Sequence, residues 1–263
     1  MNDIKDTPSQ TYLVDEMALP RKIDTTRVFE WLSKGWADVK ELKRVSTFYA
    51  ALFLMLGLLI SFGFYVMELP YLILPALSGF LLVGPAIAVG FYEGSLRCQR
   101  GEPFALTHAL LGFQRNTYSI MAIGIAQVFL FMVWIRLSFT LFAIAFPGVM
   151  PEAEPIMERM FSQEGIDFAL MIVGLGAVFA SIIFFTGSFS LPMMIDRKTV
   201  LIPAMLTSAY AVVINFKAMV LWAGLIVLIM FLGLITGVGL ILAFPLIGHA
   251  TWHAYCDVIG QKR

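Results

Sequence analysis

Long apolar runs without charged residues dominate the chain, and polar positions are confined to short stretches between them. A helix that crosses a bilayer needs about 20 apolar residues. The runs predict six transmembrane helices, at about residues 46–67, 71–96, 117–146, 167–195, 217–236 and 238–257. We therefore predict an all-α polytopic membrane protein, in which residues 45–258 form three helical hairpins.

Two turns define the hairpins at the ends of this domain. The first two spans are separated only by Glu68, Leu69 and Pro70. The last apolar run, residues 218–256, is about twice the length of one span and carries glycines near its middle. Glycine allows the backbone angles of a tight turn, so we place a turn near Gly237.

Composition supports this class and excludes others. Of the 263 residues, 59% are hydrophobic and only 14% are charged, against roughly a quarter charged in soluble globular proteins. A soluble enzyme, a disordered chain and a disulfide-rich secreted domain are all excluded. The net charge is zero, which gives no indication of nucleic-acid binding. Cys98 and Cys256 follow no metal-ligand or redox spacing.

The positive charges predict the orientation. With six spans and a cytoplasmic N-terminus, all Lys and Arg except Arg136 and Arg159 lie on the cytoplasmic side. Residues 1–25 have no signal-peptide pattern and are expected to form a flexible cytoplasmic tail, as are residues 259–263. A seventh span over residues 200–216 would move basic residues outside, so we expect an interfacial or re-entrant helix there.

Residues 26–44 have the pattern of an amphipathic interfacial helix. Its expected apolar face is formed by Val28, Phe29, Leu32, Trp36 and Val39. Two tryptophans, at positions 31 and 36, suit the headgroup region. We expect an anchor parallel to the membrane; docking to a partner is the alternative.

Two segments, residues 82–116 and 189–215, share an order of features that indicates an internal repeat. Each has a proline late in a span, then an acidic residue, an arginine, a second proline and a final asparagine. The last span repeats the first element. The kinking prolines are Pro85, Pro192 and Pro245. Small residues nearby allow close helix contacts: Gly84, Gly90, Gly187 and Gly248.

The three kinked spans are expected to converge on the cytoplasmic side and to form one polar cluster. Its candidate members are Glu93, Arg97, Asp196, Arg197, His249 and His253. The acidic and basic residues pair with each other and extend to the interface, or they line a proton or ion pathway.

His249 and His253 are four residues apart on one helical face, a spacing that suits a metal or haem. Glu93 and Asp196 would complete a metal site if the spans converge. The alternative is an ordinary interfacial belt of histidine and aromatic residues. No nucleotide-binding, hydrolase or zinc-protease motif is present, so we predict no catalytic residues and no enzyme activity.

Three motifs resemble signatures of a bacterial family of integral membrane proteins of unknown function. They are GP-x6-YE from Gly84, SLPM-x2-DR from Ser190 and GHATWHAY from Gly248. The resemblance extends over about residues 30–258. It implies a multi-span inner-membrane protein, found mainly in proteobacteria, with no established activity. Some relatives are loosely labelled as cytochrome oxidase proteins, but three histidines are too few for a catalytic oxidase subunit.

Three functions follow as hypotheses. The first is a non-enzymatic structural or assembly component of a membrane complex, with a respiratory complex as one candidate. The second is a transporter or channel for a small solute, because transporters are often built from repeats with broken helices. The third is a haem- or metal-binding protein that uses His249 and His253.

Overall fold

The computed structural model describes residues 19–68, 84–146 and 162–260, and all regular structure in these ranges is helical. Most of the predicted N-terminal tail, the outer part of the second predicted span and residues 261–263 lie outside the described residues. The helices are α2 (Arg27–Glu41), α3 (Lys43–Val66), α5 (Gly84–Ile87), α6 (Val89–Arg100), α7 (Leu106–Leu110), the 3₁₀ helix η2 (Gly112–Asn116), α8 (Thr117–Ala145), α10 (Gln163–Gly187), α11 (Ser190–Arg197), α12 (Leu201–Ile214), α13 (Phe216–Thr236) and α14 (Leu240–Val258).

Four helical stretches in the described residues are long and apolar enough to cross a membrane. They are α3, η2 with α8, α10 with α11, and α13. The part of the chain that the structure describes is therefore all-helical and contains four candidate membrane spans. The last predicted span forms α14, which lies outside this set and carries His249, His253 and Asp257 among its apolar residues.

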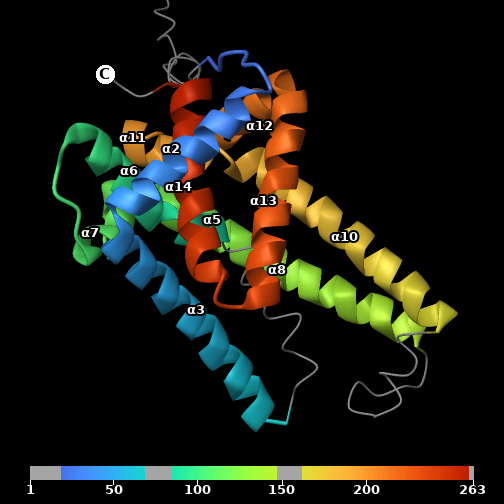
Figure 1. The fold of residues 1–263 in the computed structure, drawn as a ribbon. Helices are drawn as coiled ribbons and strands as arrows, with labels where there is room; N and C mark the ends of the chain where they lie inside the picture. Colours follow the sequence, from blue (N-terminus) through green and yellow to red (C-terminus); the bar gives the residue numbers. More distant parts are fainter. Residues whose placement is uncertain (1–18, 69–83, 147–161, 261–263) are drawn as a thin grey trace, which may run out of the picture.

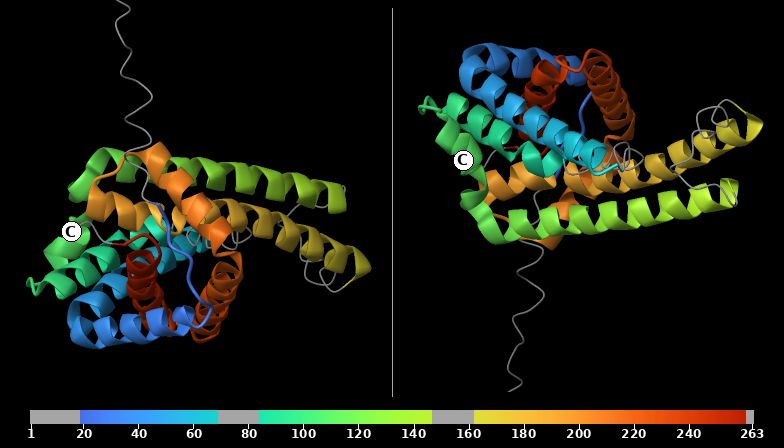
Figure 2. Two further views of the ribbon diagram at one scale, coloured as in Figure 1. Left: turned by 90° about the horizontal axis from the view of Figure 1, so that it is seen from above. Right: turned by 90° about the horizontal axis from the view of Figure 1, so that it is seen from below.

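The helices extend from one polar end of the molecule. At this end α2 crosses α14, and the short helices α6, α7 and α11 gather beside it (Figure 1). From there α3, α13 and the α8–α10 pair extend in different directions. Figure 2 shows that α8 and α10 lie side by side over their length and lean away from the other helices.

The face that α2 turns towards the protein differs from the predicted apolar face. Val28, Trp31 and Val39 are buried, and Trp31 packs edge-on against Trp222 of α13 at 5.8 Å between ring centroids. Trp31 is therefore a core residue and not a headgroup contact. Phe29 and Trp36, expected beside Val28, are 57% and 41% exposed. Compared with the prediction, α2 is turned about its own axis, because its closest contact with α14 is made through a glycine.

That glycine is Gly35, which lies directly against the backbone of α14. A Cβ atom at this position would lie 2.7 Å from the amide nitrogen of Ala250. The same use of small residues joins other helices: Gly90 lies against the ring of Tyr49, and Gly248 against Phe91. Gly187 makes no such contact, since the nearest atom to a Cβ there belongs to its own helix.

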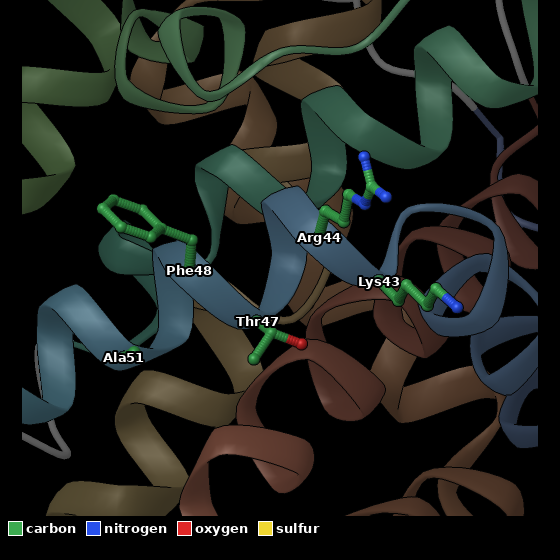
Figure 3. Close-up of a pocket in the computed structure, with 5 residues that line it drawn as sticks. All are labelled: Lys43, Arg44, Thr47, Phe48 and Ala51. Carbon is green, nitrogen blue, oxygen red and sulfur yellow. The ribbon is translucent and has the colours of Figure 1, made fainter.

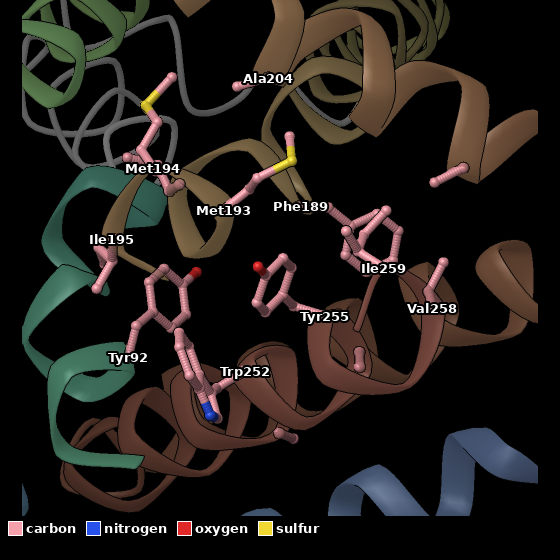
Figure 4. Packing of buried hydrophobic residues seen from close by; sticks show 14 of the residues in the cluster. Tyr92, Phe189, Met193, Met194, Ile195, Ala204, Trp252, Tyr255, Val258 and Ile259 are labelled. Atoms are coloured by element: carbon pink, nitrogen blue, oxygen red, sulfur yellow. The ribbon is translucent and has the colours of Figure 1, made fainter. Parts of the chain in front are cut away.

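The largest core lies between α6, α11 and α14. Tyr92, Met193, Met194, Trp252 and Tyr255 fill it and are almost completely buried (Figure 4). Bulky side chains from three helices fix their spacing at this end, because buried apolar side chains pack at high density.

Helix breaks accompany two of the three prolines. The chain bends at Ser188 and Phe189 between α10 and α11, four residues before Pro192, whose ring would clash with the carbonyl of residue 188 in a continuous helix. Pro85 lies in α5, which ends before Ala88, whereas Pro245 is accommodated inside α14. The turn between α13 and α14 contains Gly237 with φ of 64°, as the glycine pattern predicts.

Residues 200–216 contain α12, a short apolar helix. One face, including Ala204, Thr207 and Ala211, is buried against α10 and α11. The opposite face exposes an apolar stripe of Ile202, Leu206, Tyr210 and Val213. A helix that is apolar on its exposed face as well as on its buried face is typical of an environment away from water. The interfacial or re-entrant placement of residues 200–216 stays a prediction.

Candidate functional site

Polar side chains gather where α6, α11 and α14 meet α2 and α3 (Figure 1). They form three clusters, and each cluster joins helices that are distant in the sequence. We name them the histidine cluster, the Glu93 cluster and the Asp196 cluster.

The histidine cluster is a continuous chain of hydrogen bonds with Asp38 of α2 at its centre. The Ser95 hydroxyl donates to Asp38 Oδ2 at 2.5 Å, and His253 Nε2 lies 2.9 Å from the same oxygen. Ser95 Oγ is also 2.8 Å from His249 Nδ1, and Ser46 Oγ is 2.9 Å from His249 Nε2. His249 and Ser95 are fully buried and Ser46 almost so.

These bonds assign the donor and acceptor roles of a neutral His249 ring. The Ser95 hydroxyl has one proton and donates it to Asp38, so it accepts from the Nδ1–H of His249. His249 Nε2 is then the acceptor for Ser46. Both ring nitrogens of His249 are bonded to protein groups, and a buried polar group in this condition is satisfied.

His253 is bonded on both sides as well. Its Nε2–H donates to Asp38, and its Nδ1 accepts from the Gln99 side-chain amide at 3.4 Å. The Gln99 oxygen in turn accepts from Trp252 Nε1 at 3.0 Å. The cluster therefore connects α2, α3, α6 and α14.

The Glu93 cluster consists of one buried carboxylate between two arginines. Glu93 is 2% exposed, and its Oε1 accepts from Arg97 Nε at 2.6 Å and from Arg115 Nη2 at 2.8 Å. A further short bond joins Arg115 Nε to Glu93 Oε2. The exposed Glu102 lies 3.4 Å from Arg97 Nη1. The carboxylate thus ties η2 to α6.

The Asp196 cluster joins α11 to α14 and α6. Tyr255 donates its hydroxyl proton to Asp196 Oδ2 at 2.8 Å, and Arg100 lies 3.9 Å from Asp196 Oδ1. Arg197 Nη2 donates to the Gly260 carbonyl at 2.6 Å. Arg197 therefore holds the end of the described chain rather than an acidic side chain.

A separate ion pair fastens α2 to the end of α14. Arg27 Nη2 lies 2.6 Å from Asp257 Oδ1, and Trp31 Nε1 donates to Asp257 Oδ2 at 3.1 Å. The hydrogen bond to Asp257, together with its negative charge, raises the pKa of Arg27 above its ordinary value. Arg27 and Asp257 thus form an ion pair that connects the first turn of α2 to the last turn of α14.

The two asparagines that end the predicted repeat units have similar contacts. Asn116 Nδ2 donates to the Thr199 carbonyl at 2.9 Å, and Asn215 Nδ2 donates to the Arg21 carbonyl at 2.9 Å. Each stands at the start of a long helix and binds the backbone of another segment. The internal repeat itself stays a prediction.

The structure brings the predicted cluster residues to one end, but in separate groups. Glu93 pairs with Arg97, Asp196 with Tyr255, and the histidines with Asp38. Among the described residues, no three His, Cys, Asp or Glu side chains are placed to hold a metal ion. Both nitrogens of each histidine are also occupied by protein groups. The haem or metal hypothesis therefore gains no further ligand and stays a prediction.

Sequence reasoning missed several members of these clusters: Asp38, Ser46, Ser95, Gln99, Arg115 and Tyr255. One signal was available for Asp38. Val28, Trp31, Gly35 and Asp38 recur at spacings of three and four, which puts the carboxylate on the buried face of α2. A charged residue on such a face requires a buried partner.

Comparison with known proteins agrees with the membrane assignment. Residues 73–196 match the model of a family described as "Predicted integral membrane protein (DUF2189)". This match includes the first motif and most of the second, but not GHATWHAY, so it is shorter than the resemblance in the sequence indicates. No curated protein and no solved structure matches the chain. Over residues 73–196, the chain is similar to this family of predicted integral membrane proteins of unknown function.

Proposed function

We propose that the protein is a non-enzymatic component of a larger membrane complex, in which the α8–α10 pair packs against another membrane protein. The polar end would act as a rigid base that holds the apolar helices. A respiratory complex is one candidate for the assembly, from the label that some relatives carry.

The observation that carries this proposal is that few residues of α8 and α10 are buried by the rest of the chain. In the most apolar 18-residue window of each span, the buried share is 6% for the α8 span and 11% for the α10 span, against 22% for α3 and for α13. The face of α10 away from α8 carries Gly174, Ala177 and Ser181, which are all exposed. A Cβ atom at Gly174 would meet no atom within 4 Å.

Small residues at such spacing favour a helical partner over lipid alone. Contacts between membrane helices are enriched in Gly, Ala and Ser, because these residues let two backbones approach closely. Trp134 of α8 packs on the other side of α10, against Gly176 and Phe179. The small-residue face is thus free for a second contact.

The bonding of the polar clusters supports a non-enzymatic role. His249, Ser95 and Ser46 bond to each other and are closed to solvent, so a substrate would have to break this network to reach them. The three clusters together join α2, α3, α6, α11, α14 and η2, which is what a structural base requires.

The proposed topology has six spans in three hairpins, in a bacterial inner membrane with both termini in the cytoplasm. The distribution of Lys and Arg supports this orientation. The close contact between α13 and α14 supports a hairpin at the end of the domain.

Photo-crosslinking in native membranes tests the partner. A photoreactive residue replaces Ala177 in one variant and the exposed Val227 of α13 in a matched control. We expect one protein adduct of defined mass from position 177 and only lipid adducts from position 227. The same pattern from both positions, or an adduct with a second copy of this chain, would contradict the proposal.

A small-solute transporter is the second candidate, favoured by the helix breaks at Ala88 and at Ser188–Phe189. Broken helices at corresponding positions of two repeats are typical of transporters. Flux of small solutes into liposomes that contain the purified protein, compared with empty liposomes, tests this alternative.

A further inference from the structure

We propose that the start of α3 binds an anionic phospholipid, with Lys43, Arg44 and Thr47 at the headgroup and the apolar face below them along one acyl chain. This site is independent of the proposed protein partner, since it lies on a different helix from α8 and α10.

The site is an open groove of about 490 Å³ on the surface of α3. Lys43 and Arg44 extend from the first turn of the helix, and Thr47, Phe48 and Ala51 follow along it (Figure 3). A second groove of about 420 Å³ shares Lys43 and Arg44 and also includes Glu41 and Phe104. Lys43 and Arg44 therefore line both grooves, and the second groove also contains the negative charge of Glu41.

Charge at the groove favours an anion. Both Lys43 and Arg44 are exposed. Neither forms an ion pair or a hydrogen bond with another side chain in the part of the chain that the structure describes. By contrast, Arg27, Arg97 and Arg115 at the same end each bind a carboxylate. The hydroxyl group of Thr47, one turn further along α3, adds a hydrogen-bond donor to the groove.

The position of the groove favours a lipid as the source of that anion. Lys43 is the first residue of a candidate membrane span, so its side chain lies where the helix enters the bilayer. Below it, one face of α3 exposes Phe48, Met55, Leu59 and Phe62, which are 57%, 53%, 58% and 64% exposed. These residues recur at helical spacing from Arg44, and they form an apolar track on the same face of α3 below this cation, with Lys43 beside it.

Basic residues followed by an apolar track match a phospholipid, which has a charged headgroup followed by acyl chains. Basic side chains at a membrane surface attract anionic lipids with about 1 kcal/mol each. Removing two charges should therefore weaken binding of an anionic lipid by roughly 30-fold.

The test uses the full-length protein in nanodiscs, with phosphatidylglycerol titrated into phosphatidylcholine and bound lipid counted by native mass spectrometry. Lys43→Gln/Arg44→Gln is compared with wild type and with Lys34→Gln/Lys40→Gln, which removes two exposed cations of α2 outside the groove. We expect roughly 30-fold weaker phosphatidylglycerol binding for the first variant only. Arg44→Lys keeps the charge and should retain binding.

Three results would overturn the proposal. One is equal binding of phosphatidylglycerol and phosphatidylcholine by wild type. Another is an equal loss in both double variants, which would show general attraction by the cytoplasmic charge. The third is displacement of phosphatidylglycerol by millimolar inorganic phosphate, which would identify free phosphate as the ligand. Unchanged thermal unfolding of the variants excludes misfolding as the cause.

Discussion

Replacing Glu93 by glutamine tests whether the polar end is a stabilising base. The carboxylate is 2% exposed and receives bonds from Arg97 at 2.6 Å and from Arg115 at 2.8 Å, in addition to the short bond from Arg115 Nε. A glutamine side chain has one accepting oxygen and an amide group that itself donates. At least one guanidinium N–H would therefore lose its acceptor and face the amide group of the glutamine.

The magnitude follows from the burial of the partners. Removing one member of a fully buried ion pair costs about 3–5 kcal/mol. The two arginines are 20% and 25% exposed, so water replaces part of the lost bonding. We expect a loss of about 2–3 kcal/mol for Glu93→Gln, or about 5–10 °C in the unfolding midpoint of a chain of this size.

The assay is thermal unfolding of the purified protein in one detergent, followed by tryptophan fluorescence. Glu102→Gln is the matched control, because Glu102 contacts the same Arg97 at 3.4 Å but is 39% exposed. An exposed pair contributes at most about 1 kcal/mol, so the control should lower the midpoint by no more than a few degrees. Equal midpoints for the two variants would refute the reasoning.

Three further predictions concern α2 and the histidine cluster. Gly35→Val places a Cβ 2.7 Å from the Ala250 amide and should separate α2 from α14, seen as a red shift in tryptophan fluorescence; an unchanged spectrum would contradict the close crossing. His249→Ala leaves the buried Ser46 hydroxyl without its side-chain partner, removes one of the two partners of Ser95 and creates a cavity, so it should cost about 2–5 kcal/mol in unfolding experiments, whereas a loss below about 1 kcal/mol would show that the network is dispensable. Hydrogen bonds from the Thr26 amide and hydroxyl hold the pKa of Asp24 below its ordinary value, so they support the start of α2 above about pH 4 and are lost as the pH falls through that lowered pKa. The protection of the first-turn amides of α2, measured against their intrinsic exchange rate at each pH, should therefore fall at low pH, and Asp24→Asn should abolish this dependence.

The long apolar helices were predictable from sequence because their signal is local. A run of about 20 apolar residues defines a span without knowledge of its neighbours. The predicted spans at 46–67, 117–146 and 217–236 accordingly lie close to α3, α8 and α13. The turn at Gly237, where φ is 64°, was likewise predictable from the glycine itself.

The site was only partly predictable, because its contacts join distant residues. Glu93 and Arg97 are four residues apart on one helix, and that spacing predicts their pairing. Asp38 and Ser95 are 57 residues apart, and His253 is 215 residues from Asp38. No local pattern indicates which helix will cover Asp38, so the sequence favoured a histidine–acid cluster with Glu93 and Asp196 instead.

The rotation of α2 has a similar cause. Hydrophobicity alone groups Phe29 and Trp36 with Val28, but close packing on Ala250 requires the absence of a side chain at Gly35. Steric fit at Gly35 therefore decides which face of α2 is buried, and Asp38 is buried because it lies on the same face.

The central claim is that this chain works within a larger membrane complex. The most direct measurement is purification of the tagged protein from its native membrane in mild detergent, followed by a native gel and mass spectrometry of the band. We predict at least one other membrane protein in a fixed, stoichiometric amount. A band that contains only this chain, as a monomer or as a homo-oligomer, would contradict the proposal.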